Sequence, residues 1–277
     1  MRPSWLRPDG RVAIMGILNV TPDSFSDGGL FLSPDKALEQ ARLLIEAGAD
    51  ILDIGGESTR PGAHPVSADE ECHRLVPVIE AIRRRFPVTL SVDTSDPQVM
   101  REAVAAGAQL LNDVRAFTRR GALEAAAALD VPICLMHGAA DPSIIATSPQ
   151  GPHDLVGQVR DFLVERVQAA RAAGIAPQDI VIDPGFGFGK DAAANRILLQ
   201  SLPELGDVGP VLIGLSRKRF TGEPWGLAVD QRLYTSLALA LAAVSGGARV
   251  VRVHDVRATR EAVRAWEWVF GPKEWVA

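Results

Sequence analysis

The chain has 277 residues, of which 47% are hydrophobic and 23% charged, so it can fill a sizeable core and does not have the composition of a disordered protein. Its net charge of −5, with no basic run beyond the three arginines at 83–85, disfavours nucleic-acid binding. Two cysteines make no disulfide framework, no secretory signal opens the chain, and the longest uncharged stretch (233–248) is too short for a membrane span, so we expect a cytoplasmic protein that binds no membrane.

Eight short apolar runs recur along the chain, each rich in Val, Ile and Leu, as in parallel strands that are buried on both faces. They predict strands at 12–18, 51–54, 88–92, 110–111, 131–136, 180–182, 211–215 and 250–253. Helices are predicted between and after them, at 34–47, 68–85, 97–106, 121–129, 154–173, 195–202, 232–245 and 258–270. Successive β-then-α units favour the α/β class and a closed (β/α)8 TIM barrel, as a single domain over residues 1–277, with a doubly wound open sheet as the alternative.

Helix-capping residues support these boundaries. Ser33, Ser67 and Asp96 precede predicted helices and are expected N-caps, the second with a Glu available for a capping box. Gly48 and Gly107 follow predicted helices and are expected C-caps.

Polar side chains stand at the end of every predicted strand. In a barrel these strand ends converge on one mouth, where barrel enzymes hold their active sites. One such residue alone is usually a turn former or helix cap, but a polar residue at all eight ends predicts a functional site. The residues are Asn19; Asp53, Glu57, Thr59 and Arg60; Asp93; Asn112 and Asp113; His137; Asp183; Ser216, Arg217 and Lys218; and Arg252, His254 and Asp255.

Three loops add to this site. The glycine-rich segment 183–190 is neither a Walker loop nor a dinucleotide fingerprint, and it indicates either a turn that lets a flat ligand approach the backbone or an ordinary tight turn. The segments 19–29 and 57–62 are longer than most strand-to-helix connections, which favours a role in closing over a substrate. No two histidines have zinc-ligand spacing, and His254 suits either a phosphate contact or a structural role.

Distinctive motifs occur at the strand ends, in order along the chain. They lie at 15–27 (Met-Gly-Ile-Leu-Asn-Val-Thr-Pro-Asp-Ser-Phe-Ser-Asp), 53–62 (Asp-Ile-Gly-Gly-Glu-Ser-Thr-Arg-Pro-Gly), 91–94, 112–114, 136–137, 183–188 (Asp-Pro-Gly-Phe-Gly-Phe), 216–218 and 252–256. Through these motifs the sequence resembles the dihydropteroate synthase family over almost its whole length. The resemblance implies a transferase of folate biosynthesis that joins 6-hydroxymethyl-7,8-dihydropterin pyrophosphate to p-aminobenzoate and releases pyrophosphate. It also implies Mg²⁺ as cofactor and a homodimer.

The resemblance, read with side-chain chemistry, assigns pterin contacts to the mouth. Asp183 is expected to accept two adjacent N–H groups of the pterin, and Asn112 to bond another ring edge. Asp93 would bond a ring nitrogen and stabilise positive charge as the C–O bond breaks, and Lys218 would contact the ring carbonyl. Met136 and Phe188 complete the expected pterin site.

Other residues are expected to bind the leaving group and the second substrate. Arg252, His254 and Asn19 are expected to hold pyrophosphate, with Asn19 also a Mg²⁺ ligand. The expected catalytic residues are therefore Asp93, Lys218, Arg252 and His254. The expected p-aminobenzoate site, which excludes water from a dissociative reaction, comprises Phe25, Thr59, Arg60, Pro61 and Arg219.

The sequence departs from the family pattern at Arg115, Gly138 and Arg219, the last replacing a serine near the aminobenzoate carboxylate. Arg219 can offer that carboxylate a full positive charge, or it can point to solvent or pair with Glu223. Two other functions remain open: a pterin-dependent corrinoid methyltransferase and a catalytically silent pterin-binding subunit.

Overall fold

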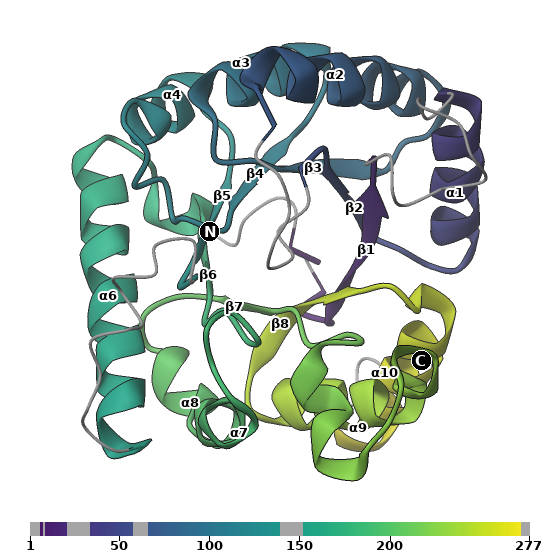
Figure 1. The fold of residues 1–277 in the computed structure, drawn as a ribbon, viewed down its shortest axis with the longest axis vertical. Coiled ribbons are helices and arrows are strands. Elements are labelled where there is room, and N and C mark those ends of the chain that lie inside the picture. The colour runs from purple at the N-terminus through teal and green to yellow at the C-terminus, as the bar shows by residue number, and fades with distance from the viewer. Residues whose placement is uncertain (1–5, 8, 21–33, 58–65, 139–151, 273–277) are drawn as a thin grey trace.

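The computed structural model describes residues 6–7, 9–20, 34–57, 66–138 and 152–272. The strands pair in parallel and in chain order into a closed barrel, and helices surround it (Figure 1). Because β1 also pairs with β8, the predicted barrel is confirmed and the open sheet is excluded. The strands are β1 (Ala13–Asn19), β2 (Ile51–Gly55), β3 (Thr89–Asp93), β4 (Leu110–Asp113), β5 (Ile133–Met136), β6 (Ile180–Asp183), β7 (Val211–Ile213) and β8 (Ala248–Val253).

The helices follow the strands around the ring, with small shifts from the predicted boundaries. The largest difference is at residues 195–202, where one helix was predicted and two are found, because Pro203 lacks an N–H and cannot continue α7. The helices are α1 (Pro34–Glu46), α2 (Ala68–Arg85), α3 (Pro97–Ala106), α4 (Ala122–Leu129), α6 (Pro152–Ala172), α7 (Ala192–Gln200), α8 (Leu202–Leu205), α9 (Leu233–Ser245) and α10 (Val256–Phe270).

Several predicted helix ends are confirmed. The Ser67 side chain accepts a hydrogen bond from the Glu70 amide at 3.3 Å, and Asp96 accepts one from Gln98 at 2.8 Å. Gly107 ends α3 with a φ of +118°, a backbone conformation that glycine adopts without strain. The predicted cap at Ser33 lies outside the described residues.

Side chains alternate along each strand between the barrel interior and the helices, which produces two apolar layers. Ile51 belongs to one group of buried residues and its neighbour Leu52 to the other, and Leu110 and Leu111 divide in the same way. The smaller group fills the barrel interior: Leu6, Ala13, Met15, Ile51, Leu110, Cys134, Val181, Leu212 and Val250. The interior below the mouth is therefore a solid apolar core.

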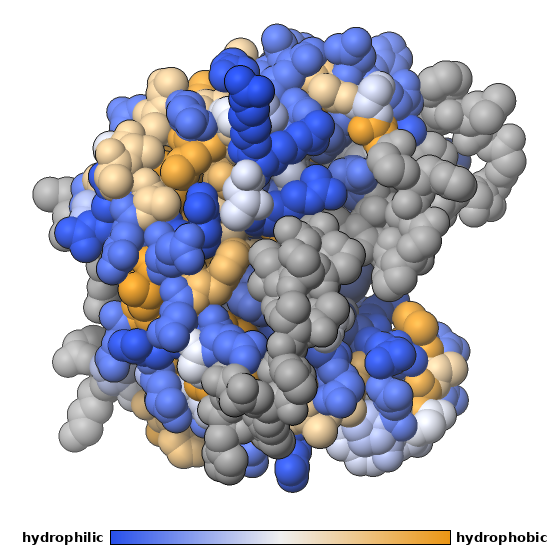
Figure 2. All heavy atoms as spheres, turned by 60° about the vertical axis from the view of Figure 1, so that its left-hand side comes forward, coloured by the Kyte–Doolittle hydropathy of each residue, from blue (hydrophilic) through white to orange (hydrophobic). Residues whose placement is uncertain are grey.

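The outer surface is mainly hydrophilic on the face that Figure 2 shows, with apolar side chains in patches between polar ones. None of the helices in the described ranges combines the length and the apolar content that crossing a bilayer requires.

Asp113 organises the turn that leads from β4 to α4. Its buried carboxylate accepts hydrogen bonds from the Ser95 hydroxyl, from the Arg115 amide at 2.8 Å and from the Phe117 amide at 2.7 Å. These bonds hold Ala116 and Phe117 at φ values of +50° and +57°, which side chains disfavour. Asp113, although it lies at a strand end, therefore stabilises the backbone of this turn.

We expect Asp113→Ala to lower the free energy of unfolding by about 2–4 kcal/mol, because it leaves three buried donors without an acceptor. Urea unfolding measures the change. Asp191→Ala is the matched control, since this exposed N-cap of α7 accepts one bond, from the Ala194 amide, and should cost about 1 kcal/mol. Equal losses in the two variants would contradict the role given to Asp113.

Candidate active site

The alternation that places apolar residues inside the barrel places polar residues directly above them. Ile51 is followed two residues later by Asp53, and Leu110, Val181 and Val250 are each followed in the same way by a polar residue. Register brings these positions together, since Asp93 pairs with Asn112 on the next strand and Met136 pairs with Asp183. The carboxyl-end layer of the barrel consists of Asn19, Asp53, Ser91, Asp93, Asn112, Met136, Asp183 and Arg252.

Arg252 joins two carboxylates from other strands at the centre of this layer. Its Nε donates to Asp53 Oδ2 at 2.5 Å and its Nη2 to Asp93 Oδ2 at 2.9 Å. Asp53 is completely buried and also accepts bonds from Ser91 Oγ at 2.6 Å and Asn112 Nδ2 at 3.2 Å. The guanidinium is thereby fixed in one orientation across the mouth, with part of its surface toward solvent.

Sequence reasoning placed Arg252, Asp93 and Asn112 in the site but gave no role to Asp53. Its burial and three partners show that it orients Arg252 and Asn112 from below. The signal in the sequence was its place within a run of apolar residues at 51–54, where an unpaired carboxylate would be unfavourable.

Burial and neighbouring charges shift the pKa values of this network. Burial raises the pKa of Asp93 to about 7, against the opposing effect of Arg252 and together with that of Asp53. Burial lowers the pKa of Arg252, but the two carboxylates outweigh it and the pKa is raised overall, so the guanidinium stays charged. Asp93 can therefore change its protonation near neutral pH.

Asp183 ends β6 and faces the same mouth. Its Oδ1 accepts a hydrogen bond from the Gly185 amide at 2.7 Å. Burial raises its pKa, while Lys218, the Gly185 amide, Lys190 and Arg252 favour the ionised form. A buried carboxylate surrounded by cations is suited to accept N–H groups from a bound ring.

Lys218 lies across the site from the β7 side. Its Nζ donates to the Phe186 carbonyl at 2.6 Å and lies 4.4 Å from the centroid of the Phe188 ring. Burial lowers its pKa to about 8, against the influence of Asp183. The ammonium therefore links the turn after β6 to the turn after β7 and adds positive charge beside Asp183.

The outer part of the mouth contains His254 and Asn19. His254 Nδ1 lies 3.1 Å from Ser216 Oγ, and its backbone amide donates to the same oxygen at 3.2 Å. Arg217 donates to the neighbouring Asp255 at 2.8 Å. Asn19 ends β1 beside Gly55, half-buried. His254 and Arg217 thus add polar and positively charged groups at this edge of the mouth.

Lys190 and His137 form a buried polar pair that sequence reasoning did not assign. Lys190 Nζ lies 3.1 Å from His137 Nδ1 and donates to the Gly185 carbonyl at 2.8 Å. His137 followed a predicted strand and Lys190 ended the glycine-rich segment, but only the fold brings the two side chains together.

Some expected contacts lie elsewhere or outside the described residues. Arg219 follows Lys218 with its side chain 74% exposed, and its Nε lies 3.4 Å from Glu223, which is the second of the two arrangements the sequence allowed. Four expected residues of the two long loops lie outside the described ranges: Phe25, Thr59, Arg60 and Pro61.

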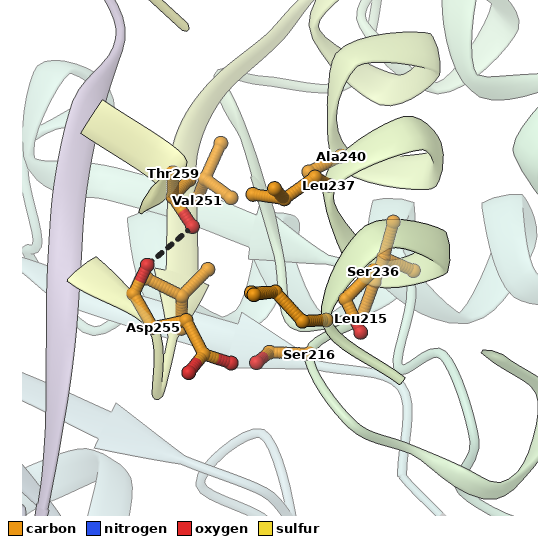
Figure 3. A pocket seen from close by; sticks show the side chains of 10 residues that line it. Leu215, Ser216, Ser236, Leu237, Ala240, Val251, Asp255 and Thr259 are labelled. Carbon is orange, nitrogen blue, oxygen red and sulfur yellow. Dashed lines mark hydrogen bonds between the residues drawn. The ribbon is translucent and has the colours of Figure 1, made fainter. Parts of the chain in front are cut away.

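A separate hollow lies behind β7 and β8, against α9 and α10 (Figure 3). Leu237 and Ala240 from α9 face Val251 from β8, and Thr259 donates to the Asp255 carbonyl at 2.8 Å. Because its lining is mainly apolar and none of the residues of the central network takes part, this hollow belongs to the packing of the barrel wall.

The chain is similar to known proteins over most of its length. A family model described as pterin binding enzyme matches residues 15–254. Dihydropteroate synthase of Escherichia coli (strain K12) is 47% identical over 262 residues, which are 94% of this chain and 93% of the relative. The solved structure of Xanthomonas albilineans dihydropteroate synthase with 4-aminobenzoic acid is 50% identical, with a TM-score of 0.87 and coverage of 94% and 93%. The same bacterial enzyme in complex with 7,8-dihydropteroate is 47% identical, with a TM-score of 0.85 and 95% of each chain covered.

Proposed function

The chain belongs to the pterin binding enzyme family, and from this premise we propose that it is a transferase with dihydropteroate synthase activity. It joins 6-hydroxymethyl-7,8-dihydropterin pyrophosphate to p-aminobenzoate and releases pyrophosphate. The observation that carries the proposal is the group of buried carboxylates and cations at the mouth, centred on Asp183, Asp93 and Arg252. Similarity to enzymes solved with p-aminobenzoate and with dihydropteroate supports the choice of substrates.

Pterin recognition rests on Asp183, whose carboxylate accepts two adjacent N–H groups of the ring. Asn112 bonds another ring edge with its amide, and Lys218 contacts the ring carbonyl. Met136 lies opposite Asp183 in the sheet and, with Phe188, gives the ring apolar contacts. Charged donors and acceptors in a buried site make such contacts stronger than neutral ones.

The reaction proceeds by departure of pyrophosphate before the arylamine attacks. Breaking the C–O bond leaves positive charge on the pterin methylene group, which the ionised Asp93 carboxylate stabilises. Arg252 reaches both the ring and the departing group from its position between Asp53 and Asp93. His254 binds the pyrophosphate oxygens at the outer edge of the mouth.

Mg²⁺ is part of the same proposal. Among the described residues, no three His, Cys, Asp or Glu side chains are grouped so as to hold a metal ion. Mg²⁺ keeps several waters and is usually bound through few protein oxygens together with substrate phosphates. The Asn19 amide oxygen, at the end of β1, would supply the protein ligand. When bound, the ion would neutralise charge on the leaving pyrophosphate.

The p-aminobenzoate site is proposed at the two long loops. Thr59, Arg60 and Pro61, with Phe25, would shape the pocket and keep water from the cationic centre. The reaction uses no thiol, and both cysteines, Cys72 and Cys134, are free. The cytoplasmic location expected from the sequence is proposed with the same function.

Incubation with the pterin pyrophosphate and p-aminobenzoate, scored for release of pyrophosphate and formation of dihydropteroate, tests the function directly. A corrinoid methyltransferase would instead transfer a methyl group from a tetrahydrofolate and release no pyrophosphate. A silent subunit would bind pterin and convert nothing. Either outcome would overturn the proposal.

We expect Asp183→Ala to remove nearly all pterin binding while the fold remains intact. Loss of a charge-assisted pair that also leaves ligand donors unpaired costs on the order of 2–4 kcal/mol. Calorimetry with a pterin measures the loss, and circular dichroism checks the fold. Affinity equal to that of the unaltered protein would exclude Asp183 from the pterin site.

Activity should rise with pH through about 7, because burial raises the pKa of Asp93 to about 7 and only its ionised form stabilises the cation. Above that range it should fall as Lys218, with a pKa lowered to about 8, loses its proton. The measurement is kcat/KM against pH, which reports the free enzyme. In Asp93→Asn the rise near neutrality should vanish and the rate should drop by about two orders of magnitude. If kcat/KM of this variant still rose with pH near 7, the rise would belong to a group other than Asp93.

Arg219 pairs with Glu223 in this structure, and we propose that on substrate binding it exchanges this partner for the carboxylate of p-aminobenzoate, which favours the substrate over sulfonamides, whose larger group replaces the carboxylate. Arg219→Ser should weaken p-aminobenzoate by roughly 1–2 kcal/mol and a sulfonamide by less. The measurements are KM for p-aminobenzoate and the inhibition constant of the drug. Glu223→Gln is the control, since it releases Arg219 from its ion pair and should not weaken the substrate. No change in either constant for Arg219→Ser would leave Arg219 as a surface residue.

A homodimer is also proposed, and α9 and α10 offer its surface. Tyr234, Trp268, Val269 and Phe270 are large apolar side chains that are 58–79% exposed in the single chain. Exposed apolar groups of this size mark association surfaces. Light scattering should give about twice the 29.6 kDa mass of one chain, and Trp268→Glu should lower it. Leu43→Glu, on α1, should not, and a monomeric unaltered chain would contradict the proposal.

A further inference from the structure

Lys190 is buried behind the glycine-rich turn of residues 184–189, and none of the roles described above uses it. Its Nζ donates to the Gly185 carbonyl at 2.8 Å, and it lies 3.3 Å from both the His137 and Phe188 carbonyl oxygens. His137 Nδ1 is the fourth neighbour, at 3.1 Å. An ammonium has N–H donors and no acceptor, so all of these contacts suit its charged form.

The contact with His137 fixes the state of the imidazole. Because Lys190 can only donate, Nδ1 must be the acceptor, and the ring proton then resides on Nε2. Burial, with the nearby charge of Lys190, lowers the pKa of His137 to about 3, so the ring stays neutral. The ring also packs edge-on against Phe162, with centroids 5.0 Å apart.

The same turn holds Asp183. The Gly185 amide donates to Asp183 Oδ1 at 2.7 Å, and the His137 amide donates to the Asp183 carbonyl at 2.9 Å. The two residues that bind the Asp183 carboxylate and backbone, Gly185 and His137, are therefore also bound by Lys190 through their carbonyls. A Cβ at Gly185 would lie 1.8 Å from the His137 carbonyl oxygen, which shows how closely the turn packs on this residue.

Asn195 secures the other side of the turn. Its fully buried side chain accepts a bond from the Gly187 amide at 2.8 Å and donates to the Lys190 carbonyl at 3.0 Å. The Lys190 backbone is thus fixed by Asn195, and its side chain reaches back under Gly185. The Lys190 ammonium therefore contacts the turn next to Asp183, on the side opposite to Asn195.

We propose that Lys190 is a positioning residue for pterin recognition, which binds the Gly185 and His137 carbonyls and thereby holds the Gly185 amide where it orients the Asp183 carboxylate. The inference rests on the proposed pterin contact of Asp183. Charge acts in the same direction, because Lys190 is one of the cations that favour the ionised form of Asp183, and only that form accepts two N–H groups. Burial lowers the pKa of Lys190 to about 7, against the influence of Asp183.

Lys190→Met keeps the length of the side chain and removes its charge and donors. We expect the dissociation constant of 6-hydroxymethylpterin, measured by calorimetry, to rise about tenfold or more. The dissociation constant of inorganic pyrophosphate, bound at the opposite edge of the mouth, should stay within about twofold. Equal losses for the two ligands, or no loss for the pterin, would overturn the proposal. Lys36→Met, an exposed lysine on α1, is the matched control and should change neither constant.

Combining Lys190→Met with Asp183→Asn shows whether Lys190 acts by positioning Asp183 or by stabilising the site in general. If Lys190 acts through Asp183, the second substitution adds less than about twofold to the loss of pterin affinity. A full additional tenfold loss would show that Lys190 acts on another part of the site and would contradict the proposal.

His137→Phe provides a second test that keeps the packing against Phe162, and it carries the test if Lys190→Met does not fold. It removes one of the four neighbours of the ammonium and should weaken pterin binding by about two- to fivefold, again without affecting pyrophosphate. Unchanged pterin affinity would overturn the role of the pair. Failure of the unaltered chain to bind pterin, or full binding by Asp183→Ala, would instead remove the proposed function on which the inference rests.

Discussion

The ion pair network of Asp53, Arg252 and Asp93 is the interaction on which the mouth of the barrel depends. Three charged side chains from three strands lie above a dry apolar interior, where any one of them alone would be unfavourable. Asp53 accepts bonds from Ser91, Asn112 and Arg252 and so fixes Asn112 and Arg252, for which we propose contacts with the ligand. A site arranged in this way needs little rearrangement to bind a polar ring.

The second constraint is the glycine-rich turn after β6. Its carbonyl groups face two ammonium groups, Lys218 on the ligand side and Lys190 on the protein side. Its Gly185 amide faces Asp183. One short segment therefore sets the distance between the main acceptor of the site and two of its cations, which is why a packed turn with positive φ values at Gly185 and Gly187 occurs there.

The ion pair network and the glycine-rich turn each hold a buried carboxylate at the mouth. Asp183 and Asp93 have raised pKa values because they are buried, and both lie close to cations that oppose the shift. A neutral pterin and a developing cation are bound best by carboxylates that are already desolvated and oriented. Arg252 lies between the Asp53 and Asp93 carboxylates. His254 and the Arg217–Asp255 ion pair lie further out, where we propose that pyrophosphate is bound.

The sequence by itself determined the eight strands and most helix boundaries, because buried parallel strands and capping residues are local patterns. It favoured a closed barrel, but only the pairing of β1 with β8 in the structure excluded the open sheet. It also placed Asp93, Asn112, Asp183, Lys218 and Arg252 at one mouth, because parallel strands of a barrel end on one side. Only the tertiary structure gave Asp53 its role beneath Arg252 and paired Lys190 with His137, since residues 53 and 252 meet through barrel closure and 137 and 190 through neighbouring strands. The break between α7 and α8 follows from Pro203, a local signal that the sequence contains. The exposed pairing of Arg219 with Glu223 was one of two arrangements that the sequence allowed, and only the structure decided between them, because the direction of a long side chain depends on its surroundings.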